Sequence, residues 1–349
     1  MKKRELPKKR VGQKPTRFIP SGSTLLNLAM SNKAKGGYAV GKIVNVIGDS
    51  SSGKTFLCLT AFAEMARNPR WDNYRLIFDD AEAAMEFDMD ALFGNTASRL
   101  EPPNKTEDGE PKPSRTIEDF YGNVVRAVQE EKPFVYILDS FDALSSKEGQ
   151  DRKEKFASGE EVGGSYKLDK QKAASEMLCN IADDIKNTKS LIIVISQTRD
   201  NISPMSFATK TRSGGRALKF YSTHEMWLAV GKTLKKKVRG KDRTIGVNTV
   251  VKLTKNKVTG KHTIIDFPIL YTYGVDDTTS CIEYLVSEGH WKKKGGKIVA
   301  EEFSQEGQMK TLVKWIEDNN KESELQDIVE SVWMEIEGLI KETGRKSKF

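Results

Sequence analysis

Gly48-Asp49-Ser50-Ser51-Ser52-Gly53-Lys54-Thr55 is the stretch of sequence that decides the fold. It fits G-x-x-x-x-G-K-[ST], a pattern in which backbone N–H groups wrap around phosphate oxygens. The apolar residues 43–47 before it predict a buried strand, and residues 56–66 after it predict an apolar helix. Unpaired N–H groups and the helix dipole at such a helix start both favour an anion. The stretch therefore predicts a nucleotide site, with Lys54 facing the β- and γ-phosphates and the Thr55 hydroxyl binding Mg²⁺.

Two further apolar runs end in carboxylates. Residues 74–78 predict a strand that ends at Asp79-Asp80-Ala81-Glu82, and residues 134–138 predict a strand that ends at Asp139-Ser140. Acidic side chains at the carboxyl ends of strands face the usual ligand crevice of an open α/β sheet. We expect Asp139 to hold Mg²⁺ beside Thr55. A strand that ends in Asp by chance is the alternative, and the phosphate-binding pattern in the same chain favours the metal role.

The composition is that of a globular protein. The chain has 349 residues, of which 37% are hydrophobic and 30% charged, enough for one large core and a smaller domain. It contains no apolar run of about eighteen residues, so no membrane span is expected, and its basic start lacks the apolar segment of a secretory signal. Three distant cysteines predict a reducing, cytoplasmic setting without disulfides, and three scattered histidines argue against a structural metal.

The charge predicts a polyanionic partner. The formal net charge is +8, which favours nucleic acid. Residues 1–17 hold eight Lys/Arg and one acid, interrupted by two prolines, and predict a basic flexible arm. The arm either contacts phosphates or is a solvated tail, and both interpretations stay open.

The order of predicted elements indicates an α/β core over residues 18–275. Strands at 43–47, 74–78, 134–138 and 191–195 are separated by helices at 116–130 and 168–187 or by other long crossovers, which predicts a doubly wound, mostly parallel sheet. Strands at 247–254 and 263–270 are expected to be antiparallel. The Pro-rich residues 101–115 predict a surface loop. Residues 276–349 predict a small, basic α/β domain.

Two polar segments, near residues 145–167 and 198–215, predict loops at the edge of this core. The second segment carries basic residues together with Met205 and Phe207. Basic and apolar groups together suit a single strand of nucleic acid, whose phosphates and bases both need contacts. A surface loop without a ligand is the alternative.

Several further matches make the chain similar to the RecA family of recombinases, from about residue 19 to residue 319. Three are Ser21-Gly22-Ser23 upstream of the phosphate loop, Asp80-Ala81-Glu82, and Leu138-Asp139-Ser140. Three more specific ones are Ser196-Gln197-Thr198-Arg199, Gly214-Gly215-Arg216-Ala217-Leu218-Lys219-Phe220-Tyr221, and Lys255-Asn256-Lys257 followed by Ile269-Leu270-Tyr271 and Gly274. Their order and spacing follow the family pattern.

The resemblance implies a role for each matching residue. Glu82 would polarise the water that attacks ATP, and Gln197 would sense the γ-phosphate. Lys255 and Lys257 would reach the nucleotide of a neighbouring subunit, and Phe220 would lie at the subunit interface. DNA would be bound by Arg199, Lys210, Arg212, Gly214, Gly215 and Arg216.

The resemblance also implies an activity. An ATP- and Mg²⁺-dependent recombinase would assemble on single-stranded DNA as a filament, take up double-stranded DNA on its C-terminal domain and pair the two. Single-strand-binding and loader proteins would be its partners, and the cytoplasm, or a host's cytoplasm for a phage-encoded chain, its location. A hexameric, ring-forming helicase or accessory motor and a non-hydrolysing regulatory module are the alternatives.

The chain departs from the family pattern at several positions. The N-terminal element that docks on the next subunit is reduced to the short basic arm. Met89 stands where an adenine-stacking tyrosine is expected, and Phe56 replaces the second hydroxyl of the phosphate loop. The end of the chain is basic where bacterial members often end acidic. These departures resemble phage-borne recombinases more than the housekeeping bacterial protein.

Overall fold

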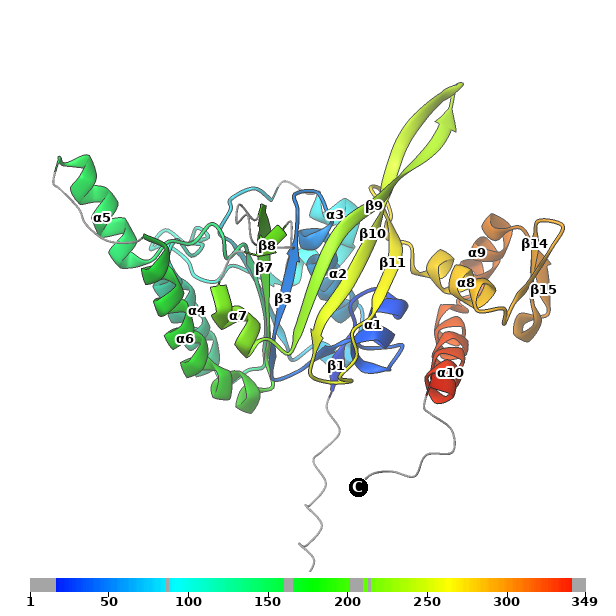
Figure 1. Ribbon diagram of the computed structural model, residues 1–349, viewed down its shortest axis with the longest axis horizontal. Coiled ribbons are helices and arrows are strands. Elements are labelled where there is room, and N and C mark those ends of the chain that lie inside the picture. The colour runs from blue at the N-terminus through cyan, green and yellow to red at the C-terminus, as the bar shows by residue number, and fades with distance from the viewer. Residues whose placement is uncertain (1–16, 86–87, 160–165, 201–209, 213–214, 341–349) are drawn as a thin grey trace, which may run out of the picture.

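The computed structural model describes residues 17–85, 88–159, 166–200, 210–212 and 215–340. In these residues a ten-stranded sheet has the order β12-β11-β10-β9-β3-β7-β6-β4-β5, with β8 paired to β7 off this path (Figure 1). All neighbours from β9 to β5 run parallel. The predicted doubly wound, mostly parallel sheet is therefore confirmed. Besides β9, its parallel strands are β3 (Lys42–Gly48), β4 (Arg75–Asp80), β5 (Leu100–Glu101), β6 (Phe134–Asp139) and β7 (Leu191–Asp200).

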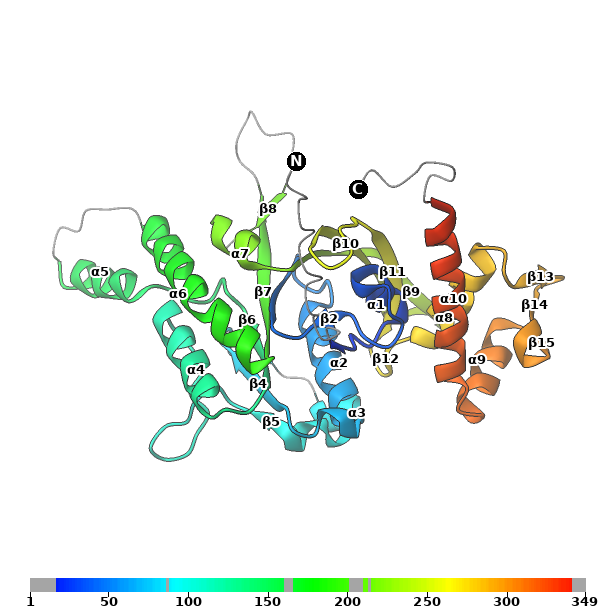
Figure 2. The same cartoon turned by 90° about the horizontal axis from the view of Figure 1, so that it is seen from below.

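Helices cover both faces of this sheet (Figure 2). Because side chains alternate along a strand, Val44 and Val46 of β3 join the buried cluster that contains α2 (Lys54–Ala66). Ile43 joins the other cluster, which contains α4 (Ile117–Gln129) and α6 (Tyr166–Thr188). The predicted amphipathic helix is α4, which starts with a capping box between Thr116 and Asp119.

Short elements complete the core. They are β1 (Phe18–Ile19), α1 (Thr24–Ser31), β2 (Tyr38–Ala39), α3 (Met89–Phe93) and the 3-10 turns Pro69–Trp71 and Gly94–Arg99. The Pro-rich segment after β5 is irregular and largely exposed, as predicted, but Ser114 at its end is buried. There the backbone N–H and hydroxyl of Ser114 donate to Asp79 at 2.9 and 2.6 Å, which anchors the segment to β4.

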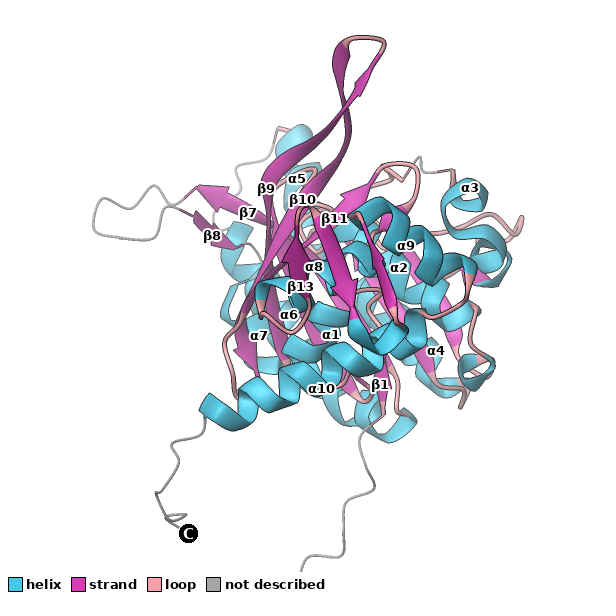
Figure 3. Cartoon of the chain, turned by 90° about the vertical axis from the view of Figure 1, so that its right-hand side faces the viewer, coloured by secondary structure: helices cyan, strands magenta, loops and turns pink. Residues whose placement is uncertain are grey.

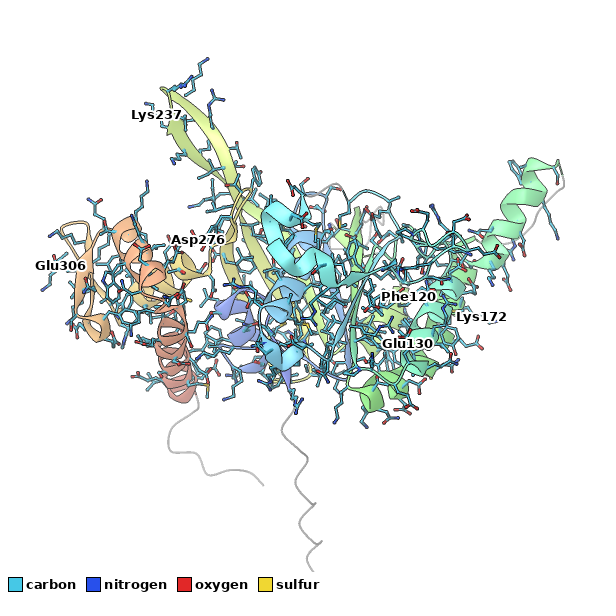
Figure 4. The ribbon with its side chains drawn as sticks, turned by 180° about the vertical axis from the view of Figure 1, so that it is seen from behind. Phe120, Glu130, Lys172, Lys237, Asp276 and Glu306 are labelled. Atoms are coloured by element: carbon cyan, nitrogen blue, oxygen red, sulfur yellow. The ribbon has the colours of Figure 1, made fainter. Side chains whose placement is uncertain are left out.

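The sheet continues as an antiparallel ladder made of β9 (His224–Val238), β10 (Lys241–Asn256), β11 (Ile264–Leu270) and β12 (Gly274–Val275). The outer parts of β9 and β10 project from the core as a two-stranded arm (Figures 1 and 3), with Lys237 near its end (Figure 4). β9 is not among the predicted strands, because its outer half is rich in lysine and shows no apolar alternation. Pairing with β10 holds this half in place, and the core does not cover it.

His224, at the start of β9, predicts a pH-dependent stability. The ring is fully buried, Nε2 lies 3.3 Å from the Met30 carbonyl oxygen, and Nδ1 has no hydrogen-bond partner among the described residues. Burial lowers the pKa of His224 to about 4 from its ordinary 6.5. The unfolded chain therefore takes up the proton first as the pH falls, and stability is lost between about pH 6.5 and pH 4, by up to about 3 kcal/mol.

We expect His224→Gln, which keeps a donor for Met30, to remove about 2 to 3 kcal/mol of the loss between pH 7 and pH 4.5. Denaturant unfolding of both chains at several pH values measures this. Parallel pH profiles for the two chains would show that His224 is not the group responsible.

Both predicted loops contain regular structure, so these predictions are wrong in part. The helix α5 (Lys147–Ala157) occupies 11 residues of the first loop. In the second, β7 continues to Asp200, β8 (Lys210–Arg212) pairs back on it antiparallel, and α7 (Gly215–Tyr221) begins at its end. The sequences of α5 and β8 are polar because neither element contributes a face to the main core, so no apolar periodicity predicts them.

The C-terminal part contains α8 (Asp277–Ser287), β13 (Lys292–Lys294), β14 (Lys297–Ala300), the 3-10 turn Glu301–Phe303, β15 (Gln305–Gly307), α9 (Met309–Asp318) and α10 (Glu322–Ile340). The prediction that residues 276–349 are basic is wrong, because they hold 11 Lys/Arg and 16 Asp/Glu. Lysines gather on the β13–β14 hairpin, whereas α10 carries six acids and no Lys or Arg. Whether this part is a separate domain stays a prediction.

Candidate nucleotide and nucleic-acid site

The phosphate loop lies where predicted, between β3 and the N-terminus of α2. Gly53 caps α2 with φ +86° and no side-chain cap, so the first N–H groups of the helix are not capped by a side chain at this position. Lys54 is buried and donates to the Asp49 carbonyl oxygen at 2.7 Å. Burial lowers the pKa of Lys54, against the opposing effect of Asp139 and Glu82. These groups fit a polyphosphate, whose negative charge would lie beside the desolvated ammonium group of Lys54 and stabilise its charged form.

At Gly48 the phosphate loop has no room for a side chain. A Cβ atom there would meet the Leu228 carbonyl oxygen at 2.5 Å and the Ser52 hydroxyl at 2.6 Å. Because Leu228 belongs to the neighbouring strand β9, the clash is with backbone that cannot move freely. We expect Gly48→Ala to lower the free energy of unfolding by about 2 kcal/mol and to weaken nucleotide binding.

The matched control for this variant is Gly122→Ala, in the middle of α4, where a Cβ atom would meet nothing within 4 Å. There alanine should stabilise the helix by about 0.5 to 1 kcal/mol. Thermal unfolding and binding of a fluorescent nucleotide measure both effects. Equal behaviour of the two variants would contradict the close approach of β9 to the loop.

The two predicted metal ligands lie together. The Thr55 hydroxyl donates to Asp139 Oδ2 at 2.5 Å, although the residues are on α2 and β6. Burial raises the pKa of Asp139 to about 6, with Glu82 and Asp80 adding to the rise. A carboxylate beside a hydroxyl fits Mg²⁺, which prefers oxygen ligands and usually retains phosphates and waters as its others. Thr55 and Asp139 would hold the ion, and its charge would favour the ionised form of Asp139.

Glu82 is brought to the same edge of the sheet by the parallel strands. Gln197 Nε2, at the end of the core part of β7, donates to Glu82 Oε1 at 2.8 Å, and the Ser140 hydroxyl donates to the same oxygen. The backbone N–H of Glu82 donates to the Asp139 carbonyl oxygen at 3.0 Å. Three sequence-predicted residues, from three neighbouring strands, thus form one cluster.

Sequence reasoning missed two residues of this cluster. Asp142 Oδ2 accepts from the backbone N–H of Gln197 at 2.7 Å, and the Thr198 hydroxyl donates to the side chain of Asp49 in the phosphate loop. Thr198 therefore joins the phosphate loop directly to the strand that leads into β8. Thr198 belongs to the matched segment Ser196-Gln197-Thr198-Arg199, but no role was assigned to it, and Asp142 lies two residues after the matched Leu138-Asp139-Ser140.

The expected DNA-binding residues lie beyond this cluster on the same ribbon. In the register of β7 and β8, Arg199 faces Thr211 and Arg212 faces Thr198, and Lys210 pairs with Asp200. Gly214 lies outside the described residues. Gly215 begins α7, and Arg216 next to it is exposed.

Lys255 and Lys257 lie at the other end of the sheet from the phosphate loop of their own chain. Lys255 pairs with Glu225, which faces Asn45 in β3, whereas the loop follows Gly48. Lys255 Nζ donates to the Phe220 carbonyl oxygen at 3.0 Å, and Lys257 Nζ to the same oxygen at 3.4 Å. Burial lowers the pKa of Lys255 to about 8, and the neighbouring Lys257 adds to the effect.

Phe220 completes this second cluster. Its side chain is 70% exposed on α7, with Lys257 Nζ 6.0 Å from the ring centroid. A large exposed aromatic ring beside two lysines is compatible with a subunit contact. The structure therefore separates the predicted site residues into one cluster at the phosphate loop and one at the opposite end.

At the two positions near the loop that depart from the family pattern, the side chains pack against other apolar residues. Phe56 is 8% exposed and its ring centroid lies 5.2 Å from that of Phe93. Met89, at the start of α3, is partly buried against the core. Neither side chain can supply the hydroxyl or the flat ring expected at its position.

The doubly wound sheet, the phosphate loop and the Thr55–Asp139 pair define a P-loop nucleotide-binding protein. Comparison with known proteins narrows this class. The family model for the RecA N-terminal domain matches residues 6–276, and the chain belongs to the RecA family. It is 29% identical to protein RecA of Enterococcus faecalis over 279 residues. This aligned region covers 79% of this chain and 72% of that protein. It is 30% identical over 284 residues to protein RecA of Corynebacterium efficiens, covering 80% of this chain and 66% of that protein.

Proposed function

We propose that this chain is an ATP-dependent DNA recombinase, which assembles on single-stranded DNA, pairs it with a homologous duplex and hydrolyses ATP in a DNA-stimulated reaction. Family membership supports the class, and the side-chain cluster at the phosphate loop supports the chemistry. One observation supports the coupling between ATP hydrolysis and DNA binding. Gln197 contacts Glu82 beside the phosphate loop and stands on the strand that runs into β8, where the expected DNA-binding residues begin.

The proposed mechanism assigns one task to each residue. The loop N–H groups and Lys54 would hold the phosphates, and Thr55 and Asp139 would hold Mg²⁺. Glu82 accepts a hydrogen bond from the attacking water and orients it. Bound ATP with Mg²⁺ supplies the phosphoanhydride bond and the charge to which these side chains respond.

Gln197 and Thr198 are the proposed coupling residues. Glu82 and Asp49 hold them through side-chain hydrogen bonds, so a change at either carboxylate is felt on β7. β7 and β8 form one antiparallel ribbon, which transmits a shift at Thr198 to Arg212. Order in this ribbon would depend on what the phosphate loop holds, which is the logic of a nucleotide switch.

The proposed assembly is a homo-oligomeric filament. Lys255 and Lys257 lie far from their own phosphate loop, and we assign them to the loop of the next subunit, with Phe220 at the contact. Such cations act like an arginine finger supplied in trans. Duplex DNA would contact the lysines of the β13–β14 hairpin, because acids outnumber basic residues in the rest of residues 276–340.

The remaining partners are proposed on family grounds alone. Single-strand-binding and loader proteins would assist assembly, in the cytoplasm or in a host's cytoplasm. Among the described residues no helix is long and apolar enough to cross a membrane.

ATP hydrolysis with and without single-stranded DNA tests the proposal, together with electron microscopy under a non-hydrolysable ATP analogue. DNA-stimulated turnover with helical filaments is the expected result. Turnover with closed rings would instead favour a helicase or motor. Negligible turnover on DNA would favour a regulatory module and remove the catalytic assignments.

A further inference from the structure

A groove with an apolar floor and an acidic rim lies between β11, α8 and α10. Its volume is about 780 Å³. Its lining includes the apolar residues Leu25, Ile264, Tyr284, Trp333, Ile336 and Ile340, which we call its floor, and the acids Asp266, Glu283, Glu288 and Glu337, which we call its rim. Lys261 also lines the groove and forms an ion pair with Glu337, so the excess negative charge comes from Asp266, Glu283 and Glu288. We call this feature the acidic groove.

The acidic groove includes an open strand edge. β12 pairs only with Ile269 and Leu270, so the first five residues of β11 have no strand partner on that side among the described residues. The side chain of Ile264, at the start of this edge, is 64% exposed. An unpaired edge beside an apolar floor is a template for an extended segment, which can add backbone hydrogen bonds and bury apolar side chains.

The chain itself contains a segment with matching chemistry. Residues 1–16 carry seven Lys/Arg and one acid, with Leu6 and Val11 between them. They join the fold at β1, and Leu25 of the groove floor lies only seven residues after Phe18. β1, the turn between β10 and β11, and the end of α10 lie on the same side of the molecule (Figures 1 and 3). Sixteen residues of extended chain span about 50 Å.

We propose that the basic arm, residues 1–16, docks in the acidic groove of its own chain. Its cations face the rim carboxylates, and its apolar side chains cover Ile264 and Trp333. The basic end of the chain, residues 341–349, is shorter and has only four Lys/Arg, so its positive charge is smaller than that of the arm. In the absence of DNA and ATP the arm is then bound to the groove, and its positive charge is not available to polyanions such as DNA.

Cross-linking in the full chain tests the docking without any use of DNA or ATP. Cys179 is the exposed cysteine, whereas Cys58 and Cys281 are buried, so Cys179→Ser gives a clean background. Gln13→Cys places one thiol in the arm, and Ser287→Cys places the other at the groove, where residue 287 is exposed. Ser304→Cys, exposed beyond the groove between β14 and β15, is the matched control for the second position.

A short bis-maleimide is expected to link positions 13 and 287 within one chain, as shown by mass spectrometry of mixed isotope-labelled and unlabelled protein. Reversing the rim charge with Glu283→Lys and Glu288→Lys should lower the yield at least about fivefold, as should high salt. Glu301→Lys with Glu306→Lys, away from the groove, should leave it unchanged. Circular dichroism confirms that each variant is folded.

Three outcomes would overturn the proposal. Equal linking to positions 287 and 304 would mean that the arm has no preferred site. Links between labelled and unlabelled chains would assign the groove to a neighbour's arm. A link to the groove from Ser347→Cys, with none from Gln13→Cys, would assign it to the end of the chain.

Discussion

Glu82→Gln is expected to abolish ATP hydrolysis, by at least about a hundredfold, while ATP and DNA binding stay within about twofold of the parent. The amide keeps the size of the side chain but loses the charge that orients the attacking water. Gln197 donates to Oε1, which becomes the amide oxygen in one rotamer of the variant, so the local structure is retained. Steady-state hydrolysis on single-stranded DNA and equilibrium binding of a fluorescent nucleotide measure the two effects.

Glu107→Gln is the control for this variant, because Glu107 is exposed in the Pro-rich segment, remote in sequence from the cluster. It should hydrolyse ATP at the parental rate. If Glu82→Gln does so as well, Glu82 has no catalytic role. If it instead loses nucleotide binding, the carboxylate has a structural role at the loop.

Lys255→Ala and Lys257→Ala should each reduce DNA-stimulated hydrolysis by roughly a hundredfold, because each removes a cation that is proposed to act on the next subunit. Nucleotide binding by the isolated subunit should be unchanged, since both lysines lie at the far end of the sheet from the phosphate loop. Lys252→Ala, which changes an exposed lysine on the same strand as Lys255, is the matched control.

Mixing two inactive variants separates action in trans from action in cis. In filaments formed from equal amounts of Lys255→Ala and Glu82→Gln, about a quarter of the subunit contacts join an intact Glu82 to an intact Lys255. Activity should therefore return to about that fraction. A mixture that stays inactive would contradict the assignment in trans, provided that both variants enter the same filaments, which fluorescence energy transfer between labelled chains can verify.

Local pattern was sufficient for the phosphate loop and for the strands that surround it. Each of these features is encoded within about ten neighbouring residues, as apolar runs, glycines and a carboxylate at a strand end. Because parallel strands place their carboxyl ends at one edge, the carboxylates Glu82 and Asp139 could be expected at one site before their contacts were known. Gln197 was assigned to the same site only through the resemblance to the family. The order of the family motifs strengthened the same conclusion.

The polar segments were predicted less well for a physical reason. α5, β8 and the outer half of β9 contribute little to the core, so their sequences lack the periodicity that marks buried elements. β8 exists by pairing with β7, and the outer half of β9 by pairing with β10. The C-terminal part was predicted to be basic from the lysine-rich turn at residues 291–297 and the basic end at residues 341–349, although its acids are more numerous and six of them lie on α10.

The sequence by itself determined the class of fold, the nucleotide site and the family, because these depend on short patterns and on the order of elements. Only the tertiary structure decided that Lys255 and Lys257 lie at the opposite end of the sheet from their own phosphate loop, that Thr198 contacts Asp49, and that an acidic groove forms beside β11. Such relations depend on the register of strands and the packing of helices that are distant in sequence, and no local pattern records them.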